Sequence, residues 1–490
     1  MKGGATRLSL LLSVLLAAMF GASRAQQGPP LTNPRIVTTH GPESFVSRLV
    51  STGLGSPWEV TWGPDGFLWV TERVGKRVVR INPATGNQSV AVTINDVYQT
   101  LAQDGLLGMA LDPDLLKGSN RDYVYVAYTY DGDPGSGVLL RMKVRRYTYD
   151  RRTERLSNPQ DILTGLPHGT DHGGGRLVFG PDGKLYLSRG DQGSNFLANY
   201  CNVNHAQDLP TAAQVHAADW TMYQGKILRI NPDGSIPADN PVINGVRSHI
   251  YSYGHRNPQG LTFTPGNRLF DSEHGESIDD EVNLVLPGKN YGWPLIAGYQ
   301  DDQSYVYANW SASAPEPCAS LKFDVLNPPA SVPRHKESEL QLQDFMPPAR
   351  TFFTVPNGYD FRTLGNATVA PAGLEVYTSP AIPGWRNSLL LTTMISGVVF
   401  RMSLTDDPRN PVGAPVAYFK TLNRYRDIAI APDGIHFYVA TDPDGRTVGP
   451  DGALTRELAN PDAILEFVYA APKQTGGPRP SSATAVRLRP

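Results

Sequence analysis

The sequence repeats one stretch, first seen as Trp62-Gly-Pro-Asp-Gly-Phe-Leu-Trp-Val-Thr-Glu72. Clear copies follow at residues 179–189, 263–273 and 431–441, and weaker copies begin at Leu111 and Val369. Each copy has the pattern of a strand, a turn rich in Pro, Asp and Gly, and a second apolar strand. Six copies along 490 residues predict an all-β fold, a six-bladed β-propeller of four-stranded antiparallel blades.

A pair of β-sandwiches would contain similar strands and turns, but a repeat that spans the whole chain favours radial repetition in one domain. Residues 45–50 and 463–469 are both strand-like and are expected to complete one blade together. We therefore assign residues 45–470 to the propeller and residues 26–44 to an N-terminal extension. Residues 471–490 are rich in Pro, Gly, Ser and Arg and are predicted to form a disordered tail.

The first residues have the pattern of a secretory signal. Lys2 and Arg7 precede an apolar run over residues 8–20, and small residues lead to Ala25. The run is too short to span a bilayer. We therefore expect residues 1–25 to be a signal peptide and the mature protein to be periplasmic or secreted, with no membrane span.

Net charge and cysteine content say little about which partners or covalent links the protein has. The net charge is −2 at pH 7, which gives no reason to expect nucleic acid as a partner. The chain has two cysteines, Cys201 and Cys318. Export permits a disulfide between them but does not require one.

Polar residues gather in the loops that precede the repeats. Gln103 lies before the second copy, Asp171 and His172 before the third and Arg256 before the fourth, while Asp191 ends the third copy. Equivalent positions on successive blades face one mouth of the central channel, so these side chains are expected to converge. A histidine beside carboxylates and an arginine can act as a general base. Taken alone, a histidine in a Gly-rich loop is more often a solvated loop residue, and only the set of equivalent loops favours catalysis.

A pair of arginines precedes the last clear copy, in Asn423-Arg424-Tyr425-Arg426-Asp427. Alternation along an extended segment puts Arg424 and Arg426 on one face and Tyr425 on the other. Two adjacent guanidinium groups need an anion to neutralise them. The pattern indicates a polycarboxylate or phosphate ligand, although an internal Asp or Glu would serve the same purpose.

Eight blocks along the chain resemble the soluble pyrroloquinoline-quinone (PQQ) dependent glucose dehydrogenases and the wider glucose/sorbosone dehydrogenase family. The blocks are Gly63-Pro-Asp with Thr71-Glu-Arg73, Asp104-Gly-Leu-Leu-Gly108, Asp171-His172 with Gly175-Arg-Leu-Val178, Gly190-Asp-Gln-Gly193, Gly254-His-Arg-Asn-Pro-Gln-Gly260, Asp279-Asp-Glu-Val-Asn283, Asn290-Tyr-Gly-Trp-Pro294 and Asn423-Arg-Tyr-Arg-Asp427. They occur in the family's order and span nearly the full length.

The resemblance implies a propeller that holds PQQ and an active-site Ca²⁺ in its mouth. Such an enzyme oxidises an aldose at C1 to the lactone. Hydride passes to C5 of the quinone, and the electrons then pass to an external acceptor, a quinone or a cytochrome. The resemblance also suggests a homodimer.

Individual roles follow from the matching motifs. The resemblance makes His172 the base that takes the hydroxyl proton, Asp191 the residue that orients its imidazole, and Gln103 and Asp171 the sugar-binding residues. It places Arg256 against the quinone, where it stabilises oxyanion charge. The other PQQ contacts that it implies are Asn257, His274, Thr368, Arg424 and Arg426. The three carboxylates of PQQ would neutralise the paired arginines.

Two calcium sites are implied. In the first, the main-chain carbonyls of Gly275 and Glu276 hold the ion together with cofactor atoms, since Ca²⁺ prefers oxygen ligands. The alternative is direct binding by the side chains of Asp279, Asp280 and Glu281. The second, structural site is implied by residues that match the family one by one: Ala297, Tyr299, Asp301 and Glu337.

Five positions depart from the family pattern. Ile395 stands where a Lys is expected against the cofactor, and Asn366 where a Trp is expected. His274 replaces a Gln, Glu276 a Pro, and Phe196 a Gln on the sugar side. Loss of one cation and one ring is expected to weaken PQQ binding or to open the sugar pocket. We therefore expect a broader or different aldose specificity than for glucose alone.

Two other classes of function remain open at this stage. A calcium-dependent lactonase-like hydrolase also places a metal and a histidine at the mouth of a six-bladed propeller, but it has no use for paired arginines. A propeller that binds sugar without redox chemistry is the other alternative.

Overall fold

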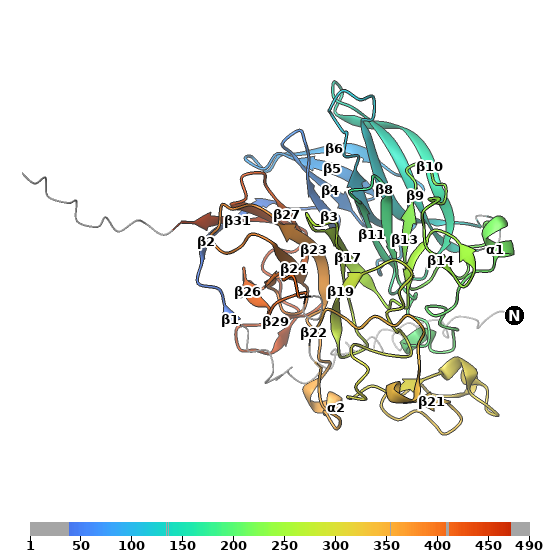
Figure 1. The fold of residues 1–490 in the computed structure, drawn as a ribbon. Coiled ribbons are helices and arrows are strands. Elements are labelled where there is room, and N and C mark those ends of the chain that lie inside the picture. The colour runs from blue at the N-terminus through green and yellow to red at the C-terminus, as the bar shows by residue number, and fades with distance from the viewer. Residues whose placement is uncertain (1–38, 134, 136, 353, 408–410, 472–490) are drawn as a thin grey trace, which may run out of the picture.

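The computed structural model describes residues 39–471 apart from 134, 136, 353 and 408–410. The predicted signal peptide and the tail from residue 472 lie outside the described residues. Six antiparallel blades of four strands form the body of the molecule, as the repeat predicts (Figure 1). Their innermost strands contact one another in a closed ring, β3, β7, β11, β17, β23, β27 and back to β3.

The strands of the first three blades, in order from the channel outward, are β3 (Pro57–Trp62), β4 (Leu68–Glu72), β5 (Arg77–Ile81) and β6 (Gln88–Thr93); β7 (Leu106–Leu111), β8 (Tyr123–Asp131), β9 (Leu140–Asp150) and β10 (Arg155–Pro167); and β11 (Gly174–Phe179), β12 (Leu185–Arg189), β13 (Lys226–Ile230) and β16 (Ile250–Tyr253).

The other three blades are β17 (Pro258–Phe263), β18 (Leu269–Glu273), β19 (Asp280–Val285) and β22 (Arg350–Phe352); β23 (Pro371–Tyr377), β24 (Ser388–Thr393), β25 (Val399–Ser403) and β26 (Val416–Tyr418); and β27 (Tyr425–Ile430), β28 (His436–Thr441), β31 (Ile464–Ala470) and β2 (Ser44–Ser51).

The aspartate of the repeated turn fixes the copies in the first and third blades. Asp65 accepts hydrogen bonds from Trp69 Nε1 at 3.1 Å and from Arg80 Nε at 2.9 Å, so one carboxylate ties the turn to the second and third strands of its blade. Asp182 of the third blade accepts a bond from the Tyr186 hydroxyl in the same way, at 3.0 Å. The repeated Pro-Asp-Gly therefore provides both the turn geometry and the contact that fixes it.

The two ends of the chain close the ring. β2 pairs antiparallel with β31, which in turn pairs with β28, so the sixth blade is built from both ends of the propeller (Figure 1). The predicted pairing of residues 45–50 with 463–469 is confirmed, with Leu49 opposite Leu465. Aromatic and aliphatic side chains fill the spaces between blades, and each fully buried one contributes about 1.5–3 kcal/mol.

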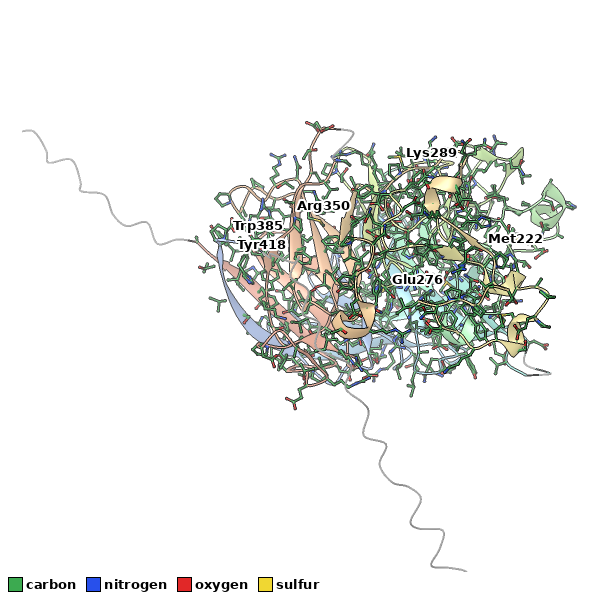
Figure 2. All side chains as sticks on the ribbon, turned by 90° about the horizontal axis from the view of Figure 1, so that it is seen from below. Met222, Glu276, Lys289, Arg350, Trp385 and Tyr418 are labelled. Carbon is green, nitrogen blue, oxygen red and sulfur yellow. A yellow bond between two sulfur atoms is a disulfide. The ribbon has the colours of Figure 1, made fainter. Side chains whose placement is uncertain are left out.

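The N-terminal extension contributes a strand that the sequence did not predict. β1 (Thr39–His40) pairs parallel with β26, the outer strand of the fifth blade. The Tyr418 hydroxyl donates to Glu43 at 2.5 Å, and its ring packs on Trp385 with centroids 4.6 Å apart (Figure 2). The extension thereby covers an edge of the fifth blade that would otherwise be unpaired.

Short elements lie in the connections. They are α1 (Ala212–His216), α2 (Phe361–Leu364), the 3₁₀ turns Leu197–Asn199, Trp310–Ala312, Cys318–Ser320 and Glu337–Glu339, and the two-residue strands β14 (Val242–Ile243), β15 (Val246–Arg247), β20 (Tyr307–Ala308), β21 (Arg334–His335), β29 (Thr447–Val448) and β30 (Leu454–Thr455). Within the described part of the chain, no helix has the length and apolar character needed to cross a membrane.

A long insertion, residues 286–349, separates β19 from β22. A disulfide between Cys201 and Cys318 joins this insertion to the loop that follows β12. The sequence permits this bond without predicting it, because the spacing of two cysteines 117 residues apart does not show whether they meet. The bond links the connections of the third and fourth blades.

Replacing both cysteines by serine should lower the free energy of unfolding by about 2–4 kcal/mol, because the unfolded chain loses a covalent constraint over a long loop. Thermal or urea unfolding of the Cys201→Ser/Cys318→Ser variant measures the change. The wild-type protein should lose the same stability in reductant, and the variant should not respond to reductant. Equal stability of variant and wild type would contradict the structural role of the bond.

Candidate functional site

The loops that precede the inner strands meet at one mouth of the channel. Gln103, ahead of β7, donates from Nε2 to Asp171, ahead of β11. Asn257, ahead of β17, donates to Gln103 Oε1 at 3.4 Å. Gln103 also lines one cavity with Arg424 and Arg426, at the start of β27. Loops from four blades are thus brought together, as the equivalent positions of the repeats predict.

His172 is fixed by a buried carboxylate. Its Nδ1 lies 2.8 Å from Asp191 Oδ1. His172 is 6% exposed and Asp191 is 0% exposed. An ionised carboxylate at this distance keeps the proton on Nδ1 and leaves the Nε2 lone pair free. Nε2 lies on the other side of the ring, 3.8 Å from Asp171 Oδ1. His172 has φ +42°, a left-handed backbone conformation that non-glycine residues adopt rarely and often at functional sites.

Asp191 has more hydrogen-bond donors than His172 alone. Its Oδ2 accepts from Trp293 Nε1 at 2.6 Å and from Asn204 Nδ2 at 2.9 Å, while Oδ1 also accepts from the Gly193 amide at 2.9 Å. Burial alone would raise the pKa of Asp191, but the interaction with His172, the charge of Arg256 and the hydrogen bond from Trp293 outweigh burial, so the pKa is lowered. The carboxylate therefore stays ionised.

Trp293 and Asn204 were not predicted as site residues. Trp293 was visible in the Asn290-Tyr-Gly-Trp-Pro294 block, whereas Asn204 lies in a loop with no repeat or motif. Lys226, also unpredicted, lies behind this loop. Its Nζ donates to three main-chain oxygens, those of His205, Ala206 and Gln224, at 2.6–2.9 Å. It thereby fixes the loop that carries Asn204.

Gln103 and Asp171 differ from the buried pair in their exposure. Gln103 is exposed and Asp171 is half-buried, and both lie at the rim of the mouth. The Asp171 carboxylate also accepts from the His172 amide at 2.9 Å. Both residues can therefore offer polar atoms to a ligand without first being uncovered.

Arg256 lies beneath the mouth, 6% exposed. Its guanidinium carbon is 5.1 Å from the Trp293 ring and 5.4 Å from the Phe196 ring, and Nη1 donates to the His274 carbonyl at 3.2 Å. Its Nε is buried and has no hydrogen-bond partner. A buried donor without a partner is costly, which is expected where a ligand completes the site.

Next to this mouth lies a cavity of about 190 Å³ with a positively charged wall. Arg73, Arg424 and Arg426 line it, together with Asp442 and Asp444. Burial is the main reason why the pKa values of Arg73 and Arg424 are lowered. Three guanidinium groups against two carboxylates leave a positive site for an anion. Arg73 was not predicted as a site residue, although its position directly after the second strand of a repeat could have indicated it.

The predicted alternation around Tyr425 is confirmed. Arg424 and Arg426 both line the cavity, while Tyr425 is fully buried on the other face. The internal carboxylate that the sequence left open is also present, because Arg426 Nε donates to Asp442 Oδ2 at 3.1 Å. Asp442 reaches Arg424 less closely, at 3.8 Å from Nε, and that Nε has no hydrogen-bond partner.

Of the two remaining predicted cofactor residues, one lines the arginine cavity and the other does not. His274 lines the cavity, and burial together with the charge of Arg256 holds its pKa well below the usual value, so its ring is neutral. Thr368 does not line the cavity. Its hydroxyl donates to Asp280 Oδ2 at 2.7 Å and accepts from the Ala370 amide at 2.9 Å, so Thr368 fixes the loop that leads into β23.

Gly275 and Glu276 lie in the loop after β18, and Figure 2 shows Glu276 near the centre of the molecule. The Gly275 amide donates to Asp280 Oδ1 at 3.1 Å, so Asp280 fixes this loop. Burial raises the pKa of Glu276 to about 7. The cavity that Glu276 lines measures about 210 Å³ and also contains Asn195, Tyr305 and Asn366.

The side chains of Asp279, Asp280 and Glu281 do not converge on one point. Asp280 accepts from Thr368, Val369, Ala370 and Gly275, which occupies its carboxylate. Asp280 and Glu281 are consecutive in β19 and point to opposite faces, and Glu281 accepts from the Gly298 amide at 2.8 Å. The alternative calcium site on these three side chains therefore has no support in the geometry.

The residues predicted for the second metal site gather around Glu337, which is fully buried. Its carboxylate accepts from the amides of Ala297 at 2.9 Å and Asp301 at 3.2 Å, and burial raises its pKa to about 7. Tyr299 is 38% exposed beside them. A buried carboxylate with a raised pKa next to a second acid is the environment that a cation stabilises.

Another acidic cluster was missed. His255, Asp271 and Glu273 have ligand atoms within 4.8 Å of one another, the one such group among the described residues. Glu273 Oε2 accepts from the Arg256 amide at 2.8 Å, so this cluster lies directly behind Arg256. His255 was visible in the Gly254-His-Arg block, but sequence alone did not say that its ring turns away from the mouth.

Comparison with known proteins decides the family. The model of the glucose/sorbosone dehydrogenase family matches residues 54–321 and 360–453. The chain belongs to the glucose/sorbosone dehydrogenase family. It is 40% identical over 478 residues to quinoprotein glucose dehydrogenase B of Acinetobacter calcoaceticus, covering 95% of this chain and 98% of that protein.

Two further relatives of this glucose/sorbosone dehydrogenase are more distant. The aldose sugar dehydrogenase YliI of Escherichia coli is 27% identical over 411 residues, covering 82% of this chain and 91% of that protein. The PQQ-bound structure of aldose sugar dehydrogenase from Streptomyces coelicolor superposes with a TM-score of 0.59 at 26% identity, covering 88% of this chain and 99% of that one.

The departures from the family pattern lie at the walls of the site. Ile395 packs against Ala370, Ala372 and Met394, and Met394 lines the arginine cavity. The Phe196 ring lies 6.2 Å from the His172 ring at an interplanar angle of 24°. An apolar ring therefore lies beside His172 where the family pattern has an amide.

The His255 cluster predicts a pH dependence of stability. Burial alone lowers the pKa of His255, but the neighbouring charges and hydrogen bonds of Glu273 and Asp271 outweigh burial and raise it to about 9. A raised pKa stabilises the fold fully below the unfolded value near 6.5, and this stabilisation is lost as the pH rises through about 9. Urea unfolding in EDTA should therefore show a loss on the order of 3 kcal/mol between pH 6.5 and pH 9.5.

The His255→Gln variant should lack most of this pH dependence. The matched control is His249→Gln, because burial lowers the pKa of His249 to about 4 and it stays neutral across the same range. If wild-type stability is flat between the two pH values, the imidazolium is not held by the two carboxylates.

Proposed function

We propose that this protein is a PQQ-dependent aldose dehydrogenase that oxidises the sugar at C1 to the lactone and passes the electrons to an external acceptor. The observation that carries the proposal is the buried His172–Asp191 hydrogen bond, which leaves Nε2 free at a mouth lined by polar and cationic groups. The names of the relatives, a quinoprotein glucose dehydrogenase and aldose sugar dehydrogenases, support the same activity.

The residues of the mouth fit PQQ. The cofactor carries three carboxylates, and the cavity offers Arg73, Arg424 and Arg426. The buried Nε atoms of Arg256 and Arg424 lack partners and can donate to a bound anion. When bound, PQQ accepts the hydride that leaves C1 of the sugar.

The chain's own residues handle the proton and the charge. Gln103 and Asp171 bind sugar hydroxyls at the rim and orient C1. His172 Nε2 takes the proton of the C1 hydroxyl, and ionised Asp191 stabilises the imidazolium that results. Arg256 stabilises the negative charge that develops on oxygen as the proton leaves. Phe196 keeps water from one face of His172.

Calcium is the metal we propose for both sites. The carbonyls of Gly275 and Glu276 are oxygen ligands of the kind that Ca²⁺ prefers, and Ala297, Tyr299, Asp301 and Glu337 supply the second set. We also propose that the protein is exported to the periplasm or medium and acts as a homodimer. The Cys201–Cys318 disulfide supports export, because such bonds persist in oxidising compartments.

Reconstitution tests the activity. Purified apoprotein should reduce a dye with D-glucose or another aldose only after PQQ and Ca²⁺ are added, and EDTA should prevent this. His172→Ala should lower kcat by about 10²–10⁴, because a general base contributes that much. If no aldose reduces the dye and no PQQ absorbance stays with the protein, the proposal fails and lactone hydrolysis is the next assay.

Cofactor affinity tests the arginine cavity separately from catalysis. Arg424→Ala should raise the Kd for PQQ about 10- to 100-fold, because a charge-assisted hydrogen bond contributes about 1.5–3 kcal/mol. Titration of apoprotein followed by tryptophan fluorescence measures the change. Arg121→Ala is the matched control, since its side chain is 44% exposed and pairs with Asp112 and Asp114, which do not line the cavity. Unchanged affinity in Arg424→Ala would mean that the cofactor does not lie against this arginine.

A further inference from the structure

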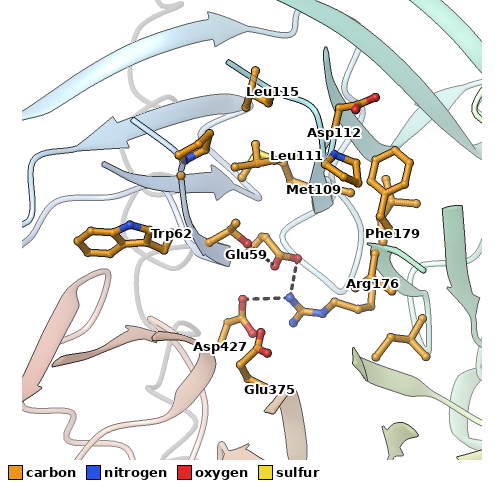
Figure 3. Close-up of a pocket in the computed structure, with 18 of the residues that line it drawn as sticks. Glu59, Trp62, Met109, Leu111, Asp112, Leu115, Arg176, Phe179, Glu375 and Asp427 are labelled. Carbon is orange, nitrogen blue, oxygen red and sulfur yellow. Dashed lines mark hydrogen bonds and ion pairs between the residues drawn. The ribbon is translucent and has the colours of Figure 1, made fainter. Parts of the chain in front are cut away.

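The channel has a second mouth, at the other end of the inner strands. A cavity of about 700 Å³ opens there, lined by the ends of these strands that lie farthest from His172 (Figure 3). The turns of the repeat form its rim, with Pro64, Pro113 and Pro432 among the lining residues. Cavities of this size commonly hold small molecules. The proposed dehydrogenase reaction does not use this space.

Four charged side chains from four blades meet at its inner end. Arg176 Nη1 lies 2.5 Å from Glu59 Oε2 and 3.0 Å from Asp427 Oδ2, as the dashed lines in Figure 3 show. Glu375 of β23 also lines the cavity and is half-buried. The site therefore has three carboxyl groups and one guanidinium.

Arg176 has donors to spare. It is 3% exposed, its Nε donates to the Gln259 carbonyl at 3.0 Å, and Nη1 serves the two carboxylates. Nη2 is buried and has no hydrogen-bond partner. This unpaired donor and the neighbouring carboxyl groups favour a ligand that carries both acceptors and donors.

A metal ion does not match this set. Among the described residues, the His255 cluster is the one group of three or more potential metal ligands whose atoms lie within 4.8 Å of one another. Glu59 and Asp427 both contact the same Arg176 nitrogen, but the three carboxyl groups do not converge as closely as metal ligands. A ligand that contacts Glu375 as well as this pair needs more than one polar group.

A cationic ligand is not required either. Burial raises the pKa of Glu59 well above its usual range and that of Glu375 to about 7. Arg176 pairs with both Glu59 and Asp427, so part of the formal negative charge is neutralised within the site itself. A simple amine would also leave Arg176 Nη2 without an acceptor.

Aromatic rings flank the polar floor. Trp62 and Phe179 line the cavity, are half-buried, and lie on opposite sides of it in Figure 3. Apolar faces of this kind complement the C–H faces of a sugar ring, while hydroxyl groups act both as donors and as acceptors.

We propose that the second mouth is a binding site for a neutral polyhydroxylated ligand of the carbohydrate class, with hydroxyl groups on Glu59, Glu375 and Arg176 and a ring face on Trp62. This site is distinct from the His172 mouth and goes beyond the proposed dehydrogenase activity.

Binding to PQQ-free protein tests the site without any redox chemistry. D-glucose, maltose and D-glucitol are titrated by calorimetry into the Gln103→Ala/Asp171→Ala variant, in which the His172 mouth has lost its sugar contacts. At least one of the three should bind. Trp62→Ala in the same background should weaken that binding at least tenfold, and Trp62→Phe should restore it to within about threefold.

Glu375→Gln provides a second variant that leaves the volume of the cavity unchanged and should weaken binding about fivefold or more. Each variant is used only if its melting temperature stays near that of the parent. The proposal is overturned if none of the three polyols binds, if Trp62→Ala and Glu375→Gln bind as the parent does, or if 1,5-diaminopentane binds and the polyols do not. Because PQQ is absent throughout, these outcomes do not depend on the dehydrogenase activity.

Discussion

The Asp191 carboxylate is the interaction on which the rest of the mouth depends. It contacts the histidine of its own blade, an asparagine of the following loop and the indole of Trp293 from the insertion in the next blade. The main-chain amide of Asp191 also donates to the Arg256 carbonyl at 2.8 Å. One buried anion therefore sets the tautomer of His172 and joins the third and fourth blades at the same point. Removing it would leave several buried donors without a partner, which costs more than the loss of one contact.

The rest of the mouth is incomplete as a protein structure, and this incompleteness is informative. Donors on Arg256 and Arg424 are buried without partners, and three guanidinium groups crowd one small cavity. A fold that only needed stability would replace them by apolar side chains. The grouping of three guanidinium groups in one small cavity indicates the face of the propeller that is built around a ligand. The Arg176 cluster at the opposite end also has a buried donor without a partner, but there three carboxyl groups surround one guanidinium.

The fold could be predicted because its signal is repeated and local. Pro-Asp-Gly turns, alternating strands and the pairing of the two ends all appear in the sequence and were found where expected, except in the fifth blade. There the copy that begins at Val369 was wrong about the turn, because Pro371-Ala-Gly373 lies in β23 and the turn to β24 is formed by residues 378–387. The convergence of Gln103, His172 and Arg256 followed from the same repetition. Asn204, Lys226 and the His255 cluster could not be predicted, because their contacts depend on how irregular loops pack against a neighbouring blade. The β1 strand was missed because two residues carry no periodic signal.

The pairing of β2 with β31 also bears on how the chain folds. The inner strand β27 contacts both β3 and β23, so the sixth blade borders the channel through β27 alone. Its two outer strands come from the opposite ends of the propeller, and Ser44 pairs with Ala470. Bringing such distant residues together carries a large loop-closure cost, and it has to be met before the blade is complete. The apolar side chains of β28 and β31 are covered only when the two ends of the chain have met.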